Sequence, residues 1–308
     1  MGDEKYINAA SNVRGKKFNI FFCLFGYSVK SQELEPRAYA ALPKNLNAAV
    51  GVYALSHGNV FGDPSLPIQN LRITTNSFVA GYLRTFGVAN KLARAQVTLP
   101  IFVVSGTATL NDNDTSVTRT GFGDMRIRLG VNLVGAPPLD KKEFTRYTEK
   151  TIIGISFITS VPTGLYLKDK LINTGSHRWA FKPEVGISKR FNSIYAEAYA
   201  GVWFYTRNHE YLTDKTLEQQ PVFDVQAHVS YYFKNRMWIS LNTTWFNGGQ
   251  TSVNGVSKGN LLDNWRIGGT WSFPIAKGQS VKLQFHVGAF TTHGYDYDIV
   301  SVGYQYLF

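Results

Sequence analysis

Apolar side chains alternate with small or polar ones through most of this sequence, and the alternation continues to the last residue. A period of two places each set on one face of a β-strand, so the alternation predicts strands with one apolar face. Each segment is long enough for a tilted strand to cross a bilayer, which takes about 9–11 residues. The twelve expected strands are residues 46–55, 71–86, 92–104, 123–135, 151–161, 178–190, 193–205, 222–233, 236–246, 264–274, 280–290 and 298–308.

The connections between these segments alternate in length. Short connections follow even-numbered strands, and long polar connections follow odd-numbered strands, with one exception at 136–147, where the link is longer than expected. An even strand count with this loop asymmetry is typical of a bacterial outer-membrane barrel. The predicted fold class is therefore all-β, a transmembrane antiparallel up-and-down β-barrel of 12 strands of the Gram-negative outer-membrane type, with both termini in the periplasm. The long connections are 105–122, 162–177, 206–220 and 247–263.

The last segment explains why large apolar groups occupy the chain end. Val300, Val302, Tyr304, Tyr306 and Phe308 share one face of the expected strand. In a closed barrel the last strand pairs with the first, so it runs to the terminus. We expect Tyr306 and Phe308 to lie in the periplasmic aromatic girdle. They also resemble the signal that the outer-membrane insertion machinery recognises, which makes that machinery an expected partner.

The start of the chain has the layout of a cleavable signal peptide. An apolar run at 18–29 follows three basic residues, and modest side chains lie before a cleavage point after residue 31. Twelve helical residues span about 18 Å, which is less than the bilayer core of about 30 Å. Because Asp3 and Glu4 do not suit a basic leader, an alternative start near Val13 is a further hypothesis. The expected domains are a signal peptide at 1–31, a periplasmic N-terminal segment or lumen plug at 32–44, and a barrel at 45–308.

Composition narrows the function classes. The formal net charge is +11, but the Lys and Arg residues are scattered, so nucleic-acid binding is not expected. Aromatic residues make up 14% of the chain, which suits many twisted strands. A soluble twelve-strand barrel or sandwich stays open as an alternative, but it would need its apolar face inside. Leader and loop asymmetry favour the Gram-negative outer membrane, with outer-membrane lipids and lipopolysaccharide as partners.

Assigning each strand by its more apolar side predicts which residues line the lumen. Ten inward bases exceed four inward acids, which leaves a difference of +6. A basic, narrow lumen would favour anions, and inward aromatic side chains would offer a surface to neutral phenols. The predicted lumen bases are Arg72, Arg84, Arg94, Arg126, Arg128, Arg178, Lys182, Arg236, Arg266 and Lys282; the acids are Asp124, Glu184, Glu197 and Asp224; the remaining lumen residues are Tyr82, Tyr195, Tyr199, Trp203, His228 and His286.

One constellation could carry enzyme chemistry. His228 and Ser230 face the same side of one strand, and Glu197 falls roughly opposite on its neighbour, so a triad is conceivable. The expected lumen position argues against it, because lipid substrates lie outside the barrel, and no oxyanion hole is visible. No catalytic residue, metal site or cofactor is expected. The acidic turn at 111–114 is more typical of a solvated turn than of a cation site.

Several stretches together resemble a known family. They include GFGD at 121–124, PTGLY at 162–166 and INTG followed two residues later by RW at 172–179, in this order. The chain from about residue 46 to 308 is similar to the meta-pathway phenol-degradation family of outer-membrane, transporter-like β-barrel proteins. The resemblance implies a barrel that moves small, often aromatic, compounds. The expected function is an outer-membrane channel or transporter-like barrel for small molecules, aromatic or anionic ones among them. The alternative is a non-conducting barrel that serves as a scaffold or as a lipid hydrolase.

Overall fold

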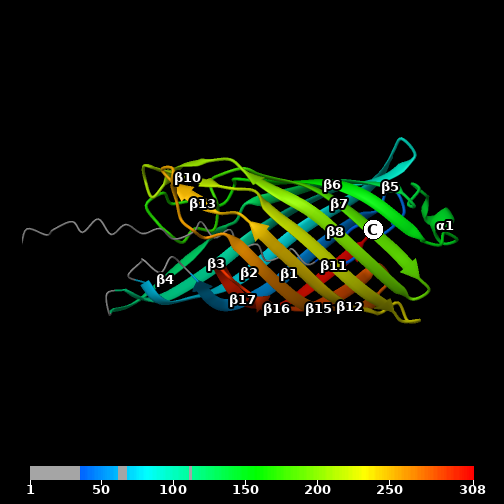
Figure 1. The fold of residues 1–308 in the computed structure, drawn as a ribbon. Coiled ribbons are helices and arrows are strands. Elements are labelled where there is room, and N and C mark those ends of the chain that lie inside the picture. The colour runs from blue at the N-terminus through cyan, green and yellow to red at the C-terminus, as the bar shows by residue number, and fades with distance from the viewer. Residues whose placement is uncertain (1–34, 62–67, 111–112) are drawn as a thin grey trace, which may run out of the picture.

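A single antiparallel sheet closes on itself in the computed structural model, which describes residues 35–61, 68–110 and 113–308 (Figure 1). β1 pairs with β2 on one edge and with β17 on the other, so the described strands form a closed 12-strand barrel, as predicted. Its strands are β1 (Asn47–Phe61), β2 (Ile68–Val88), β3 (Lys91–Leu110), β4 with β5 (Asn113–Phe122 and Met125–Val134), β6 (Thr151–Val161), β7 (Ala180–Phe191), β8 (Ile194–Tyr205), β11 (Val222–Tyr232), β12 (Trp238–Gly248), β15 (Leu262–Ala276), β16 (Gln279–Phe290) and β17 (Gly294–Leu307).

β4 and β5 form one interrupted strand. Both pair antiparallel with β3, β4 along its second half and β5 along its first half. Gly123 and Asp124 separate them, and the Gly123 backbone N–H donates to the Pro100 carbonyl at 2.9 Å. The prediction of a long loop at 105–122 is therefore wrong for most of its length. The Thr- and Ser-rich strand β4 has no apolar alternation, which is why sequence periodicity misses it.

The end of the barrel at which β3 is followed by β4 carries a second, small sheet. β9 (Asn208–Tyr211), β10 (Lys215–Gln219), β13 (Thr251–Val253) and β14 (Val256–Ser257) pair in the order β14-β13-β10-β9. These strands belong to two of the four segments that the sequence predicts as long polar connections, 206–220 and 247–263. In outer-membrane barrels the long connections face outward from the cell, so we assign this end as extracellular.

Short turns lie at the opposite end, next to the C-terminus (Figure 1). Ala89 and Asn90, between β2 and β3, and Asn192, between β7 and β8, have positive φ angles, as tight hairpin turns require. The one long connection here contains α1 (Lys141–Phe144), in which the Asp140 N–H donates to the Glu143 side chain at 3.1 Å. The longer link at 136–147 is thus a helical turn on the periplasmic side.

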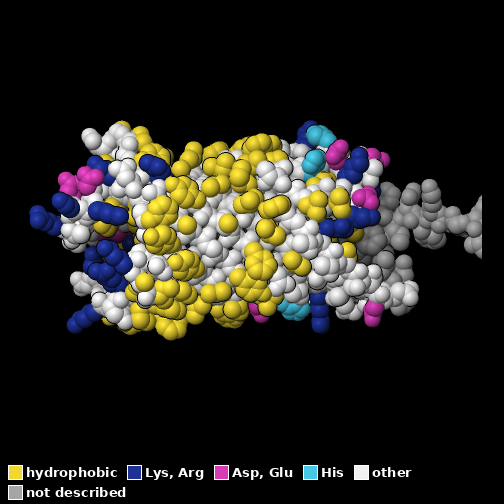
Figure 2. Space-filling view, turned by 180° about the vertical axis from the view of Figure 1, so that it is seen from behind, with side chains coloured by type: hydrophobic (Ala, Val, Ile, Leu, Met, Phe, Trp, Pro, Cys, Tyr) yellow, Lys and Arg dark blue, Asp and Glu magenta, His cyan; other side chains and the backbone are white. Residues whose placement is uncertain are grey.

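The two faces of the sheet are chemically inverted relative to a soluble barrel. Large apolar side chains cover the middle of the outside, where Leu241 is 71% exposed and Leu129 is 54% exposed (Figure 2). The inside holds many small, polar and charged groups, including Ser188, Thr244 and Asn242. This distribution suits a wall that faces lipid outside and a polar lumen inside. It excludes the soluble alternative, whose apolar face would be inward.

The seam of the barrel involves the chain end. The backbone of Phe308 exchanges two hydrogen bonds with Asn47, at 2.9 and 3.0 Å. Tyr306 and Phe308 both point outward, and their rings stack with centroids 5.5 Å apart. Their role as an insertion signal stays a prediction.

No helix in the described part of the chain is long and apolar enough to cross a membrane. The predicted signal peptide at 1–31 lies outside the described residues.

Candidate functional site

Residues 35–44 lie inside the barrel at its periplasmic end, and Tyr39 anchors them. Its side chain is 1% exposed and lies against Gly154 on β6 and Gly186 on β7. A Cβ atom added at either glycine would come within 2.2–2.3 Å of the ring. The Tyr39 hydroxyl is 2.9 Å from Ser156 Oγ and donates to Glu184 Oε1 at 3.0 Å. The two glycines therefore form a flat surface under the Tyr39 ring that residues with a Cβ atom could not provide; we call this surface the glycine seat.

The backbone of this segment is held by polar side chains of the wall. The Arg94 guanidinium donates to the carbonyl oxygens of Ala38 and Ala40, and Asn132 Nδ2 donates to the carbonyl of Tyr39 at 3.0 Å. Arg94 is buried and has no carboxylate within 4 Å among the described residues. Its two terminal nitrogens thus donate to neutral acceptors, and its charge is not cancelled locally.

Arg37 makes the charged attachment of the same segment. Its guanidinium contacts Glu149 at 2.9 Å and Glu197 at 3.4 Å, and its backbone N–H donates to Glu197 Oε2 at 2.8 Å. The guanidinium also lies 3.8 Å from the centre of the Tyr195 ring. Burial alone would lower the pKa of Arg37, but Tyr232 and these two carboxylates together raise it above its usual value. Glu197 is therefore committed to the N-terminal segment.

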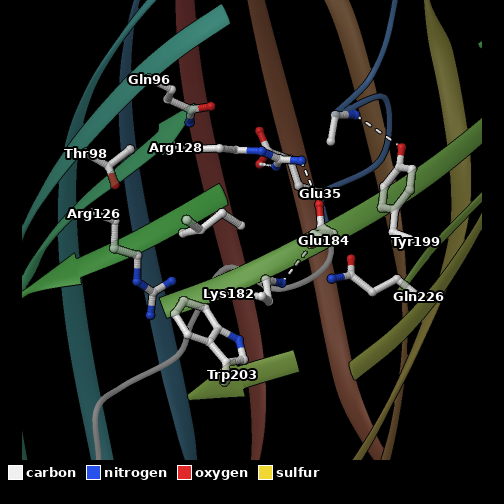
Figure 3. A pocket seen from close by; sticks show the side chains of 12 residues that line it. Glu35, Gln96, Thr98, Arg126, Arg128, Lys182, Glu184, Tyr199, Trp203 and Gln226 are labelled. Atoms are coloured by element: carbon white, nitrogen blue, oxygen red, sulfur yellow. Dashed lines mark hydrogen bonds and ion pairs between the residues drawn. The ribbon is translucent and has the colours of Figure 1, made fainter. Parts of the chain in front are cut away.

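A chain of buried ion pairs crosses the wall that β5, β6, β7, β8 and β11 form; we call it the charged wall (Figure 3). Arg128 Nη2 lies 2.7 Å from Glu184, and Lys182 Nζ lies 2.9 Å from Glu184 and 2.7 Å from Asp224. Gly201, on β8 between Glu184 and Asp224, leaves room for this crossing, since an added Cβ would lie 2.9 Å from both Lys182 and Asp224 atoms. Each carboxylate has a cation, as buried charges require.

Glu35 is the weakest member of this network. One of its carboxylate oxygens is 3.7 Å from Arg128, and its side chain is about half exposed. It lines two cavities of the lumen. The first, the charged cavity, encloses about 590 Å³ including its open mouth and is lined by Glu35, Arg126, Arg128, Tyr199 and Trp203 among others. The second cavity faces β1, β2, β16 and β17 and is treated below.

Sixteen of the twenty predicted lumen residues lie on the inner side of the wall or at its rim. Arg126 faces the charged cavity, 5.9 Å from the Trp203 ring. Asp124, Arg178 and Arg266 instead hold extracellular segments: Asp124 accepts from the Gly164 and Ser176 backbone, Arg178 bonds Gln219, and Arg266 bonds the Tyr297 carbonyl. The sixteen are Arg94, Asp124, Arg126, Arg128, Arg178, Lys182, Glu184, Tyr195, Glu197, Tyr199, Trp203, Asp224, His228, Arg266, Lys282 and His286.

Four predicted lumen residues are placed wrongly. Arg72, Tyr82 and Arg84 point outward from β2, where Tyr82 donates to Asn47 at 2.7 Å. Both faces of β2 carry apolar side chains. Assigning the more apolar face of the strand to the lipid therefore placed the wrong face of β2 in the lumen. Arg236 lies exposed in the turn between β11 and β12 with a positive φ of 68°. Seven inward bases minus four acids leave +3 instead of +6.

The conceivable triad does not assemble. β8 and β11 place Glu197 directly opposite His228, as the sequence suggested. However, His228 Nδ1 pairs with Asn242 at 2.9 Å, and Glu197 binds Arg37. No hydrogen bond joins His228 to Ser230 or to Glu197 among the described residues. The geometry therefore gives the hydrolase alternative no support.

Sequence reasoning missed the side chains of the N-terminal segment. Glu35, Arg37 and Tyr39 make the contacts described above, but a short irregular stretch has no period that indicates which side chains face a wall. Glu149, the partner of Arg37, lies in a periplasmic turn and was missed for the same reason.

Solved outer-membrane barrels have the same architecture. A crystal structure of an outer membrane channel from Pseudomonas putida F1 superposes with a TM-score of 0.77 at 17% identity, covering 90% of this chain and 100% of that one. The β-domain of the Bordetella autotransporter BrkA gives a TM-score of 0.53 at 10% identity, covering 86% of this chain and 100% of that one. No curated protein matches the chain.

The family model described as "Putative MetA-pathway of phenol degradation" matches residues 56–296, more than half of the chain. The resemblance inferred from GFGD, PTGLY and INTG with RW is thereby confirmed. The fold is that of outer-membrane β-barrels, and the chain belongs to this phenol-degradation family.

Proposed function

We propose that the protein is an outer-membrane channel for small molecules, and that its lumen prefers anions and offers them an aromatic surface. The observation that carries this proposal is a pair of lumen cations. Arg126 and Lys282 each line a cavity, and neither has a carboxylate within 4 Å among the described residues. A narrow lumen with low-dielectric walls focuses such a field.

The aromatic surface lies beside one of these cations. Tyr199 and Trp203 line the charged cavity together with Arg126, but both are buried, and Tyr39 packs against the Tyr199 ring, so this surface becomes available when residues 35–44 move. Aromatic rings of a permeating molecule can pack on these side chains, while its negative group is attracted to Arg126. Small aromatic anions combine both features, so they fit this lumen better than aromatic cations do.

We further propose that residues 35–44 act as a lumen plug that limits flow. Tyr39 fills the seat of Gly154 and Gly186, and Arg37 is held by two carboxylates. A channel closed in this way should conduct weakly until the segment moves. The Pseudomonas putida neighbour is described as an outer membrane channel, which is consistent with the same role here.

Conductance in planar lipid bilayers tests the channel function. We expect small, discrete current steps from the full-length mature protein. The matched variant is Tyr39→Ala, which removes the anchor of the plug and leaves the barrel wall unchanged. It should raise the conductance several-fold. If neither protein conducts, the barrel serves as a scaffold and the channel proposal is wrong.

A further inference from the structure

The second cavity of the lumen differs from the charged cavity in the chemistry of its lining. It encloses about 1120 Å³ including its open mouth, and it lies against the inward face of β16, β17, β1 and β2. Val50, Val52, Val79 and Leu83 give this wall an apolar surface, and we call it the apolar wall. Apolar side chains that face the inside of such a barrel favour contact with an apolar group over contact with water.

One row of residues across the four strands gives the cavity its shape. Lys282 on β16 is opposite Gly303 on β17, Gly303 is opposite Val52 on β1, and Val52 is opposite Val79 on β2. Neighbouring strands lie about 4.8 Å apart. The row therefore presents a cation, then a bare glycine, then two valines, over about 15 Å of wall.

Lys282 is the only cation that lines this cavity, and it has no salt-bridge partner among the described residues. Its Nζ lies 5.6 Å from the centre of the Trp238 ring. Nothing larger than hydrogen stands at Gly303 between the Lys282 stem and Val52; an added Cβ there would be 3.4 Å from Val52. The Trp238 contact places the ammonium group on the β12 side of this row, and no side chain at Gly303 blocks its movement toward a ligand that rests on the valines.

From this arrangement we infer a binding site for an amphipathic monocarboxylate, in which the carboxylate meets Lys282 and a phenyl or short alkyl group packs on the apolar wall. The inference rests on the proposed channel function and specifies the ligand class of its lumen. The Glu35 carboxylate competes with a ligand for Lys282, because it is half exposed and lines the same cavity. An incoming carboxylate experiences repulsion from Glu35 as well as attraction to Lys282.

Equilibrium dialysis with the full mature barrel in lipid nanodiscs tests the site. The probes are 4-phenylbutyrate and its neutral analogue 4-phenylbutanamide, each corrected with empty nanodiscs. We expect 4-phenylbutyrate to bind and the amide to bind about tenfold more weakly, because a charge-assisted hydrogen bond is lost. Lys282→Met should abolish this difference, Lys282→Arg should keep it, and Glu35→Gln should strengthen binding of the acid.

Two further variants localise the site. Gly303→Leu fills the space between Lys282 and Val52 and should weaken binding of both probes. Lys234→Met, at an exposed residue in the turn between β11 and β12, is the control and should change neither. Equal binding of acid and amide to the wild type, or binding unchanged in Lys282→Met or in Gly303→Leu, would overturn the inference.

The dialysis result is independent of conduction. Binding that depends on Lys282 in a barrel without current steps would support the site and contradict the channel. Current steps without such binding would do the reverse. Heat-modifiable gel mobility shows that each variant is folded, and Lys282→Arg keeps the test decisive if Lys282→Met does not fold.

Discussion

The charged wall and the apolar wall face each other across one lumen, yet they hold their charges in opposite ways. On the charged wall Lys182 bridges Glu184 and Asp224, and Arg128 also binds Glu184, so each charge depends on its neighbours. On the apolar wall Lys282 has no such partner among the described residues. Charges of the first kind stabilise the structure, whereas a charge of the second kind remains free for a ligand.

The residues of the N-terminal segment also differ in how they contact the two walls. Arg37 and Tyr39 make their contacts with the charged wall and with the glycine seat on β6 and β7. Glu35, at the boundary between the two cavities, is held only by a 3.7 Å contact with Arg128. Arg37 and Tyr39 therefore attach the plug on the side of the charged wall, whereas Thr85 on β2 donates to the Pro43 carbonyl at 2.7 Å, close to the start of β1. The cavity along the apolar wall remains open beside these contacts.

Removing one member of the charged network should give the largest change in stability. Lys182→Met leaves Asp224 buried without a cation, and we expect it to lower the free energy of unfolding by about 3–5 kcal/mol. Lys282→Met breaks no ion pair and should change it by less than about 0.5 kcal/mol. Denaturant titration of both variants in lipid vesicles measures the difference. Equal losses would mean that the two walls do not differ as described.

A charge on the lipid side of the charged wall tests the orientation of its strands. Leu129 follows Arg128 on β5 and is 54% exposed on the outer face. Leu129→Arg should destabilise folding by roughly 2–4 kcal/mol, because it places a guanidinium in the bilayer core. Leu129→Ile is the matched control. A neutral result for the arginine would place this face away from lipid.

The glycine seat tests the attachment of the plug. Gly186→Ala puts a methyl group within about 2.2 Å of the Tyr39 ring and should cost about 1–3 kcal/mol, or release the segment. Released chain becomes accessible to trypsin at Arg37, and the conductance rises. Gly51→Ala, where an added Cβ meets nothing within 4 Å, is the control. Unchanged cleavage and current in Gly186→Ala would show that the seat does not hold the plug.

Much of the fold could be predicted because the lipid-facing side of most strands is uniformly apolar. On β17, Val300 to Phe308 form one such face, and the structure exposes all five alternate residues. β2 violates this pattern, since its inner face carries Leu71, Ile73 and Val79. Assigning the more apolar face to the lipid therefore exchanged the two faces of β2. It placed Arg72, Tyr82 and Arg84 in the lumen, whereas they point outward.

The candidate site was harder to predict because its contacts connect residues far apart in sequence. Tyr39 meets Gly154 and Gly186, and Arg37 meets Glu149 and Glu197, only because the barrel closes around them. Local periodicity carries no information on such pairs. Whether Arg126 and Lys282 have a carboxylate partner likewise depends on which cations pair with the buried acids, and local periodicity does not indicate those pairs.

The reversal potential in a KCl gradient tests the central claim that unpaired lumen cations select the permeating ion. For the wild-type barrel we expect a sign that indicates preference for chloride. Arg126→Glu combined with Lys282→Glu should move the reversal potential toward potassium preference, whereas charge reversal at the outward-facing Arg72 should leave it unchanged. Potassium preference in the wild type, or no shift in the double variant, would contradict the account.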